Sequence, residues 1–406
     1  MGKSVHLFAT IALALLASIG TLLVLPIESA QGAAILPTDF TDSQFVSGLT
    51  DPTDMEFAPD GRLFITEDAG RLRIAKPDGT LATFLDISTK VDSTGERGLL
   101  ALTFDPNFST NHYVYLHYTR KATATTPVHN RIVRVTASGD RVVAGSEKLI
   151  FRLGNQTAAT DHQGGALDFG KDGKLYIATG DNGRDPATEP VAQQLTNLFG
   201  KMLRINKNGT IPTKNPYYST ASGNNRAIWA LGLRNPFKFA VQPGTGIIYI
   251  NDVGENTWEE INQLQKGANF GWPVCEGAHD YAGTPGEANC EVPPPPYTPP
   301  IYEYPHEGDP LNSGCSITGG VFYNPTTILF PPEYEGDYFF AEFCNGWIRK
   351  LEPPPDATSK FTASGFATGL ERPIDLEVSK AGELYYLARG STGSPASVGK
   401  IGYTSN

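Results

Sequence analysis

One phrase of sequence recurs six times along the chain, and this repetition constrains the fold more than any other feature. In its clearest copy, a run of alternating apolar residues leads through Asp172-Gly173 into a second run rich in β-branched and aromatic residues. Such a phrase predicts a β-hairpin. The six copies lie within residues 52–66, 98–116, 160–181, 231–251, 318–340 and 372–387.

Repeated hairpins cannot bury their own faces, so each must pack against its neighbours. Six of them around one axis close into a β-propeller, which leaves only short, protected strand edges. A β-sandwich with accidental hairpin similarity is the alternative. The chain has 43 Gly and 31 Pro among 406 residues and only 18% charged residues, a composition typical of many strands joined by ordered loops. We therefore predict an all-β fold, a six-bladed β-propeller over residues 35–406.

The N-terminus has the pattern of a targeting segment. Lys3 and His6 precede an apolar run over residues 7–25, and small residues follow at 29–34. This order predicts a secretory signal peptide over residues 1–34 and a secreted or periplasmic protein. Because the apolar run is nearly long enough to span a bilayer, an uncleaved N-terminal membrane anchor is the alternative.

The charge balance excludes one class of partner. The formal net charge is −11. Nucleic-acid binding needs clustered Lys and Arg to neutralise phosphates, and the chain lacks such clusters. We therefore expect no nucleic-acid partner.

Four cysteines, Cys275, Cys290, Cys315 and Cys344, lie in the C-terminal half. An even number in an exported chain without Cys-x-x-Cys spacing predicts two disulfides rather than a metal site. Of the three connectivities, we favour Cys275 with Cys290, closing a Gly- and Pro-rich insertion. Cys315 with Cys344 would then join neighbouring strands of the fifth repeat.

Four motifs, in a fixed order, carry a family resemblance. They are the runs 161–165, 232–236, 251–262 and 269–273. Together they resemble the soluble quinoprotein aldose and glucose dehydrogenases, and the resemblance extends over residues 48–403. It implies a six-bladed propeller that binds pyrroloquinoline quinone (PQQ) and calcium and oxidises the anomeric carbon of aldose sugars to lactones. The choice of sugar and of electron acceptor depends on loop shapes within the irregular insertions.

Oxidation at a sugar C1 needs a base that takes the hydroxyl proton as the hydride leaves. A neutral imidazole suits this task near neutral pH, and His162 matches the family's base position. Asp161 is the candidate to orient the ring or stabilise the imidazolium, although adjacent residues on a strand point to opposite faces. A purely structural histidine is the competing interpretation, and the following glycines favour a role in the site.

Arginine and amide side chains are the expected contacts of the carboxylate-rich quinone. Arg234 can clamp a carboxylate or polarise the quinone carbonyl, and Asn235 beside it is a candidate hydrogen-bond donor to the cofactor. Arg372 resembles one of the family's two cofactor-binding arginines. Ile374 occupies the position of the other.

Calcium is also implied by the resemblance. A hard cation takes carboxylate and carbonyl oxygens, and the carbonyls of Gly254 and Glu255 match those that hold the ion beside the quinone. A second, structural calcium is expected near Asn269, with Glu276 or Asp280 as carboxylate donor.

The sequence departs from the family at three positions. Residues 342–346 contain no lysine where the family places one against the quinone. Glu96, at a cofactor-binding position, replaces a glutamine, and Phe237 replaces a polar residue. Losing one cation near a multiply charged ligand costs on the order of 1–3 kcal/mol.

These departures keep a second class of function open. The runs 302–306, 315–320 and 343–346 are similar to extracellular propellers related to hedgehog-interacting protein, which bind partners rather than oxidise sugars. In that interpretation His162 and Arg234 are structural. A calcium-dependent sugar lactonase has no support, because no set of carboxylates in the sequence points to one shared metal.

Overall fold

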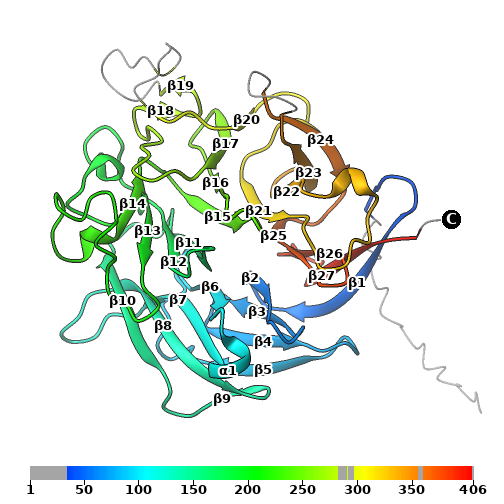
Figure 1. Ribbon diagram of the computed structural model, residues 1–406, viewed down its shortest axis with the longest axis horizontal. Helices are drawn as coiled ribbons and strands as arrows, with labels where there is room; N and C mark the ends of the chain where they lie inside the picture. The colour runs from blue at the N-terminus through cyan, green and yellow to red at the C-terminus, as the bar shows by residue number, and fades with distance from the viewer. Residues whose placement is uncertain (1–33, 282–289, 291–296, 355–359, 405–406) are drawn as a thin grey trace, which may run out of the picture. The chain divides into compact units, whose positions relative to one another are not determined.

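The computed structural model describes residues 34–281, 290, 297–354 and 360–404. These residues form six antiparallel sheets around a central axis (Figure 1), which confirms the six-bladed β-propeller. The predicted signal segment, residues 1–34, lies outside the described residues except for Ala34. Among the described residues no helix is long and apolar enough to cross a membrane.

Each blade is one sheet, whose strands follow in order from the inner to the outer edge. Blade one contains β2 (Pro52–Phe57), β3 (Leu63–Glu67), β4 (Arg71–Ala75) and β5 (Leu81–Asp86). Blade two contains β6 (Leu99–Phe104), β7 (Tyr113–Arg120), β8 (His129–Ser138) and β10 (Lys148–Asn155), with β9 (Arg141–Val142) paired to β8. Blade three contains β11 (Gly164–Phe169), β12 (Leu175–Thr179), β13 (Lys201–Ile205) and β14 (Ile228–Leu231). Blade four contains β15 (Pro236–Val241), β16 (Ile248–Asp252), β17 (Trp258–Gln263) and β20 (Tyr302–Pro305).

Blade five contains β21 (Ile317–Phe322), β22 (Tyr338–Glu342), β23 (Trp347–Glu352) and β24 (Thr362–Ala367). Blade six contains β25 (Pro373–Val378), β26 (Leu384–Ala388), β27 (Ala396–Tyr403) and β1 (Phe40–Leu49). A short pair, β18 (Cys275–Glu276) and β19 (His279–Asp280), follows blade four's third strand. The described helices are short: α1 (Phe108–Asn111), η1 (Val191–Gln193), η2 (Gly223–Ala227) and η3 (Pro332–Tyr334).

The predicted hairpins are the two inner strands of the six blades. The innermost strands, β2, β6, β11, β15, β21 and β25, contact one another in a closed ring. Apolar side chains from facing blades fill the space between them, so hairpins that cannot bury their own faces are buried by their neighbours.

Blade six closes the ring by combining both ends of the described chain. β1 pairs antiparallel with β27, from Phe40 opposite Tyr403 to Leu49 opposite Ala396. Closure by an N-terminal outer strand removes the free edges that an open array of sheets would present.

One end of the axis, which we call the site face, carries the predicted site residues. Two kinds of connection meet there: those that enter each innermost strand and those that join the second and third strands of a blade. Glu96, His162, Arg234 and Arg372 precede β6, β11, β15 and β25, and residues 253–257 join β16 to β17.

Both predicted disulfides are present, Cys275–Cys290 and Cys315–Cys344. Tyr304 and Trp347, each 1% exposed, pack in the core between blades four and five.

Candidate active site

A hollow at the axis opens on the site face. It is lined by Thr53, Asp68, Gly95, Glu96, Leu100, Gln163, Gly164, Phe237, Lys238, Ile374 and Arg389. The fold therefore brings together five residues that are far apart in sequence: Glu96, Gln163, Gly164, Phe237 and Ile374. Gln163 and Gly164 follow His162, and the other three are positions where the chain departs from the family.

His162 lies two residues before β11, whose first residue, Gly164, lines this hollow. Its backbone adopts the left-handed region, with φ of 53°, and its N–H donates to Glu96 Oε2 at 2.6 Å. Its ring Nδ1 lies 2.8 Å from Asp181 Oδ1, and the side chain is 18% exposed. A carboxylate acceptor at Nδ1 fixes the proton on that nitrogen, which leaves Nε2 as the basic nitrogen of the ring.

Asp181, rather than Asp161, orients the ring, and this corrects the sequence-based prediction. Asp161 is exposed and precedes the left-handed His162, outside the strand that starts at Gly164. Asp181 is 2% exposed, and it also accepts from the Trp272 indole Nε1 at 2.8 Å and from the Gly183 backbone N–H at 2.9 Å. Both carboxylate oxygens are thus held.

The position of Asp181 follows from the hairpin itself. Gly164 pairs with Thr179 across β11 and β12, so the residues just after Thr179 lie beside the residues just before Gly164. The same copy of the repeat contains both His162 and Asp181. Hairpin register is the signal that could have identified Asp181 from the sequence.

Asp252 fixes the backbone of the Arg234-Asn235 turn. Its two carboxylate oxygens accept the N–H of Arg234 at 3.0 Å and of Asn235 at 2.7 Å. Burial raises the pKa of Asp252 to about 7, although these two N–H groups act to lower it. The side-chain oxygen of Asn235 accepts the N–H of Gly164 at 2.9 Å, so Asn235 joins blade four to the start of the His162 strand.

The Arg234 side chain connects the surroundings of the His162–Asp181 pair to the predicted calcium loop, residues 253–257. Its guanidinium donates to the Val253 carbonyl at 3.1 Å and forms an ion pair with the Glu255 carboxylate. The same guanidinium lies 5.6 Å from the centre of the Trp272 ring. One arginine therefore touches the tryptophan that holds Asp181 and the loop that contains Gly254.

The carbonyls of Gly254 and Glu255 accept no hydrogen bond from any described residue. Two uncommitted carbonyl oxygens suit a hard cation, so these residues fit calcium, and the Glu255 carboxylate beside them is paired with Arg234.

Asn269 does not fit the second calcium site. Its side-chain oxygen accepts from Gln193 Nε2 at 3.0 Å and from the Gly271 N–H at 3.2 Å. Its carbonyl accepts the N–H of Thr298 at 2.7 Å. Both oxygens are committed, and the expected partner Glu276 is engaged by backbone N–H groups.

Blades five and six give the opposite side of the hollow an apolar wall. Phe343 and Phe237 pack against the core cluster that contains Ile374, and the exposed Arg372, with φ of 50°, lies over the Phe343 ring at 5.5 Å. The missing family lysine is therefore replaced by an aromatic surface.

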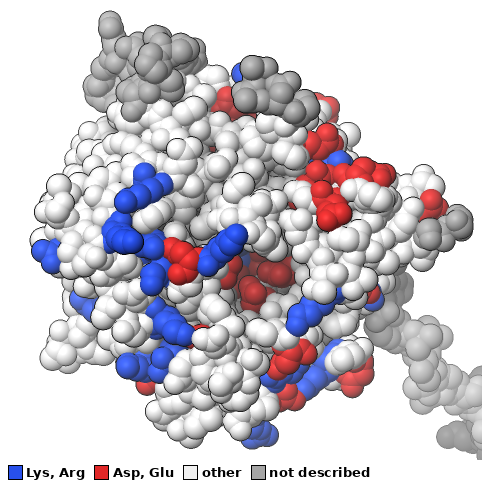
Figure 2. Space-filling model, in the orientation of Figure 1, with Lys and Arg blue, Asp and Glu red and all other residues white. Residues whose placement is uncertain are grey.

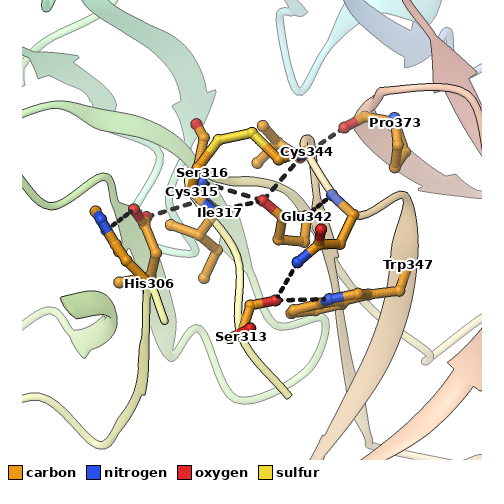
Figure 3. The surroundings of a disulfide bond; sticks show 12 residues. His306, Ser313, Cys315, Ser316, Ile317, Glu342, Cys344, Trp347 and Pro373 are labelled. Carbon is orange, nitrogen blue, oxygen red and sulfur yellow. Dashed lines mark hydrogen bonds and ion pairs between the residues drawn. A yellow bond between two sulfur atoms is a disulfide. The ribbon is translucent and has the colours of Figure 1, made fainter. Parts of the chain in front are cut away.

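The loop that carries Phe343 is held by a buried glutamate and a disulfide (Figure 3). Glu342 is fully buried, and Oε1 accepts the N–H of Cys315 at 2.8 Å, Ser316 at 3.1 Å and Cys344 at 2.9 Å. Oε2 accepts the N–H of Asn345. Among the described residues, Cys315, Glu342 and Cys344 form the one cluster of three close metal-ligating side chains. The sulfurs are bonded to each other and the carboxylate is saturated, so the cluster is structural.

A lysine that the sequence analysis did not single out lies at the floor of the hollow. Lys238 is 5% exposed and pairs with Asp54 and, at 2.9 Å, with Asp375. Burial acts to lower the pKa of Lys238, but the charges of Asp375 and Asp54 outweigh burial and raise it. Because two carboxylates neutralise this ammonium, it adds no net positive charge to the site.

Carboxylates are frequent along the axis. Figure 2 shows acidic side chains deep in a hollow at the centre of the propeller. Asp68 and Glu96 line the hollow of the site face. The hollow at the other end of the inner strands is lined by Asp54, Glu56, Asp168, Asp375 and Glu377.

Sequence similarity to known proteins agrees with this geometry. The chain matches the Glucose / Sorbosone dehydrogenase family over residues 49–396. The chain belongs to this family. It is 31% identical to quinoprotein glucose dehydrogenase B of Acinetobacter calcoaceticus over 301 residues, 68% of this chain and 62% of that protein.

Two further relatives bear on function. Human hedgehog-interacting protein is 32% identical over 238 residues, which cover 52% of this chain and 33% of that protein. The apo-form of the soluble aldose sugar dehydrogenase from Escherichia coli has 25% identity and a TM-score of 0.74, with 90% of this chain and all of that chain covered. By sequence, the Acinetobacter calcoaceticus dehydrogenase matches 68% of this chain and human hedgehog-interacting protein 52%.

Proposed function

We propose that the chain is a PQQ- and calcium-dependent dehydrogenase that oxidises the anomeric carbon of aldose sugars to lactones. The observation that carries the proposal is the His162–Asp181 pair. His162 bonds Glu96, which lines the hollow, and Arg234 links the Trp272 that holds Asp181 to a loop with uncommitted carbonyls. Disulfides support a secreted or periplasmic location. The electron acceptor is a separate molecule whose identity is open.

The His162 imidazole takes the proton from the C1 hydroxyl at Nε2. Asp181 then faces the Nδ1–H of the imidazolium and stabilises its charge, while Trp272 and Gly183 keep the carboxylate in place. When bound, PQQ supplies the acceptor for the hydride that leaves C1, and calcium supplies Lewis-acid activation of that acceptor.

Residues of blades four and six would hold the two groups. Arg234 and Arg372 would face the carboxylates of the quinone, and the carbonyls of Gly254 and Glu255 would hold the ion. Arg234 is paired with Glu255. Binding of the quinone to Arg234 would therefore compete with this ion pair, unless calcium neutralises the Glu255 carboxylate in place of Arg234.

The experiment that tests this proposal compares His162→Ala with the wild type in dye-linked oxidation of aldoses after loading with PQQ and calcium. Loss of a positioned base should reduce turnover by about 10²-fold or more, with the thermal transition unchanged. His112→Asn is the matched control, because His112 lies at the end of α1 in a left-handed conformation that Asn accepts. Undiminished turnover in His162→Ala would refute the assignment of the base.

A non-catalytic binding propeller is the second candidate, favoured by one observation. The family's lysine position lies in a loop closed by the Cys315–Cys344 disulfide, where Phe343 packs against a core cluster and no lysine is present. In that case the wild-type chain would bind no quinone, and His162 substitutions would have no effect on ligand binding.

A further inference from the structure

One carboxylate oxygen of Glu276 accepts hydrogen bonds from successive backbone N–H groups of the predicted calcium loop. Its Oε1 accepts four successive N–H groups, from Glu255 at 2.7 Å, Asn256 at 2.8 Å, Thr257 at 2.9 Å and Trp258 at 3.3 Å. The residue is 5% exposed. Hydrogen bonds from N–H groups to a carboxylate are charge-assisted and strong, so this set determines the conformation of the loop.

The same bonds set the direction of the carbonyls. In a trans peptide, the C=O of one residue points opposite to the N–H of the next. With the N–H groups of Glu255 and Asn256 turned to Glu276, the carbonyls of Gly254 and Glu255 point to the other side. Both carbonyls are therefore aimed by Glu276, not by any donor bound to them.

Gly254 lets the loop approach this closely. A Cβ at Gly254 would lie 1.7 Å from the Trp258 carbonyl oxygen and 3.0 Å from Glu276 Oε1. Any side chain there would push the loop away from Glu276. Only glycine is compatible with the observed arrangement.

Glu276 itself is fixed by both of its neighbours. Cys275 is bonded to Cys290. Gly277 has φ of +62°, and a Cβ there would meet Glu303 Oε2 at 2.4 Å and Trp258 Cβ at 3.2 Å. The carboxylate is thus presented from a short segment that a disulfide holds on one side and close packing holds on the other.

We propose that Glu276 is the positioning residue of the calcium site, and that its Oε1 holds the carbonyls of Gly254 and Glu255 toward the ion through the N–H groups of the loop. This inference rests on the proposed function, and it adds a residue that acts through the loop. Oε1 already accepts four N–H groups and is not available as a metal ligand, so the role assigned to this oxygen is to orient the loop.

The test is calcium titration calorimetry on the full chain after removal of metal by a chelator, with magnesium as the ion-specificity control. Glu276→Ala should weaken calcium binding by about tenfold or more, since the loop loses its common acceptor. Glu276→Gln keeps the acceptor oxygen and the side-chain volume and should recover part of the affinity. Glu342→Ala is the matched control, because it removes a buried glutamate that accepts four N–H groups in blade five, away from the loop.

The outcomes separate this inference from the proposed function. Weaker calcium binding in Glu276→Ala but not in Glu342→Ala supports the positioning role. Equal binding in wild type and Glu276→Ala, or equal losses in both alanine variants, overturns it. A wild type that binds no calcium overturns the inference and also the calcium part of the proposed function.

Discussion

On the side of blades three and four, the hollow of the site face is bordered by charged groups that contact one another: His162 with Asp181, and Arg234 with Glu255. On the side of blades five and six, apart from Arg389, the lining residue is the apolar Ile374, and Phe343 packs against the core cluster that contains Ile374. We call these the polar half and the apolar half. The polar half contains every group that the proposed reaction needs for proton transfer.

The two halves are also held differently. The loop of the apolar half is closed by its own disulfide and by Glu342, which bonds both sides of that disulfide. The loop of the polar half is held from a separate segment by Glu276 and keeps two carbonyls uncommitted. Under the proposed function, the chemistry and the ion therefore lie in the polar half, whereas the loop of the apolar half is closed by its own disulfide.

The largest expected effect is on turnover, from a change in the polar half. Asp181→Asn removes the charge that stabilises the imidazolium of His162 and should reduce dye-linked turnover by about 10²-fold or more. Asp161→Asn is the matched control and should retain wild-type turnover, since Asp161 is exposed and does not bond the ring. Equal losses in both variants would contradict the assignment of Asp181.

The next effect is on stability, from a change in the apolar half. Replacing Cys315 and Cys344 by serine opens a loop with a sequence separation of 29 residues, and should lower the free energy of unfolding by about 3–4 kcal/mol. Denaturant unfolding measures this loss, and calcium titration of the same variant should give unchanged affinity. A variant with lower calcium affinity would show that the two halves are not independent.

Introducing a lysine into the apolar half should have a smaller effect. Phe343→Lys places an ammonium near the region where the family has its lysine and should strengthen PQQ binding by about 1–3 kcal/mol, followed by a quinone absorbance titration. Leu311→Lys adds the same charge at a position that is 56% exposed and should leave the affinity unchanged. Equal gains in both variants would indicate a general charge effect rather than a specific contact.

The smallest effect is expected at the junction of the halves, where His306 Nε2 bonds Glu259 Oε1 at 2.7 Å and Glu259 Oε2 accepts the N–H of Ile317 at 2.8 Å. Burial acts to lower the pKa of His306, but the bond to Glu259 and its charge outweigh burial and raise it above 6.5. Burial raises the pKa of Glu259. Both groups hold protons more tightly in the folded state.

The stability from this pair is therefore present at acid pH and is lost as the pH rises through the folded-state pKa of His306. His306→Gln should destabilise the protein most below the ordinary histidine pKa and least at alkaline pH, as measured by melting temperature across a pH series. A destabilisation that does not vary with pH would contradict the charged pairing.

The architecture was predictable because it depends on local sequence patterns. Each repeat supplies an alternating run, a turn and a second run, and such hairpins have one economical arrangement when six of them must bury one another. The disulfide pairs followed from their positions around one insertion and one pair of strands. The closure of blade six by β1 was not predictable, since residues 40–49 carry no signal for the strand they pair with.

The site was predictable where a residue lies in a motif and not where its role depends on what meets it in space. His162 and Arg234 were identified from their motifs. Asp181, Lys238 and Glu276 were missed as partners because each acts across a strand, a blade or an insertion. Asp161 was favoured for its adjacency in sequence, but the ring of the left-handed His162 bonds Asp181 across the hairpin instead.

The most direct test of the proposed dehydrogenase is a titration of the metal-free full chain with PQQ, with and without calcium, followed by addition of an aldose and an electron-accepting dye. We predict saturable, calcium-dependent quinone binding and dye reduction with formation of the lactone. Absence of quinone binding at micromolar PQQ in the presence of calcium would contradict the proposed dehydrogenase and favour a binding propeller.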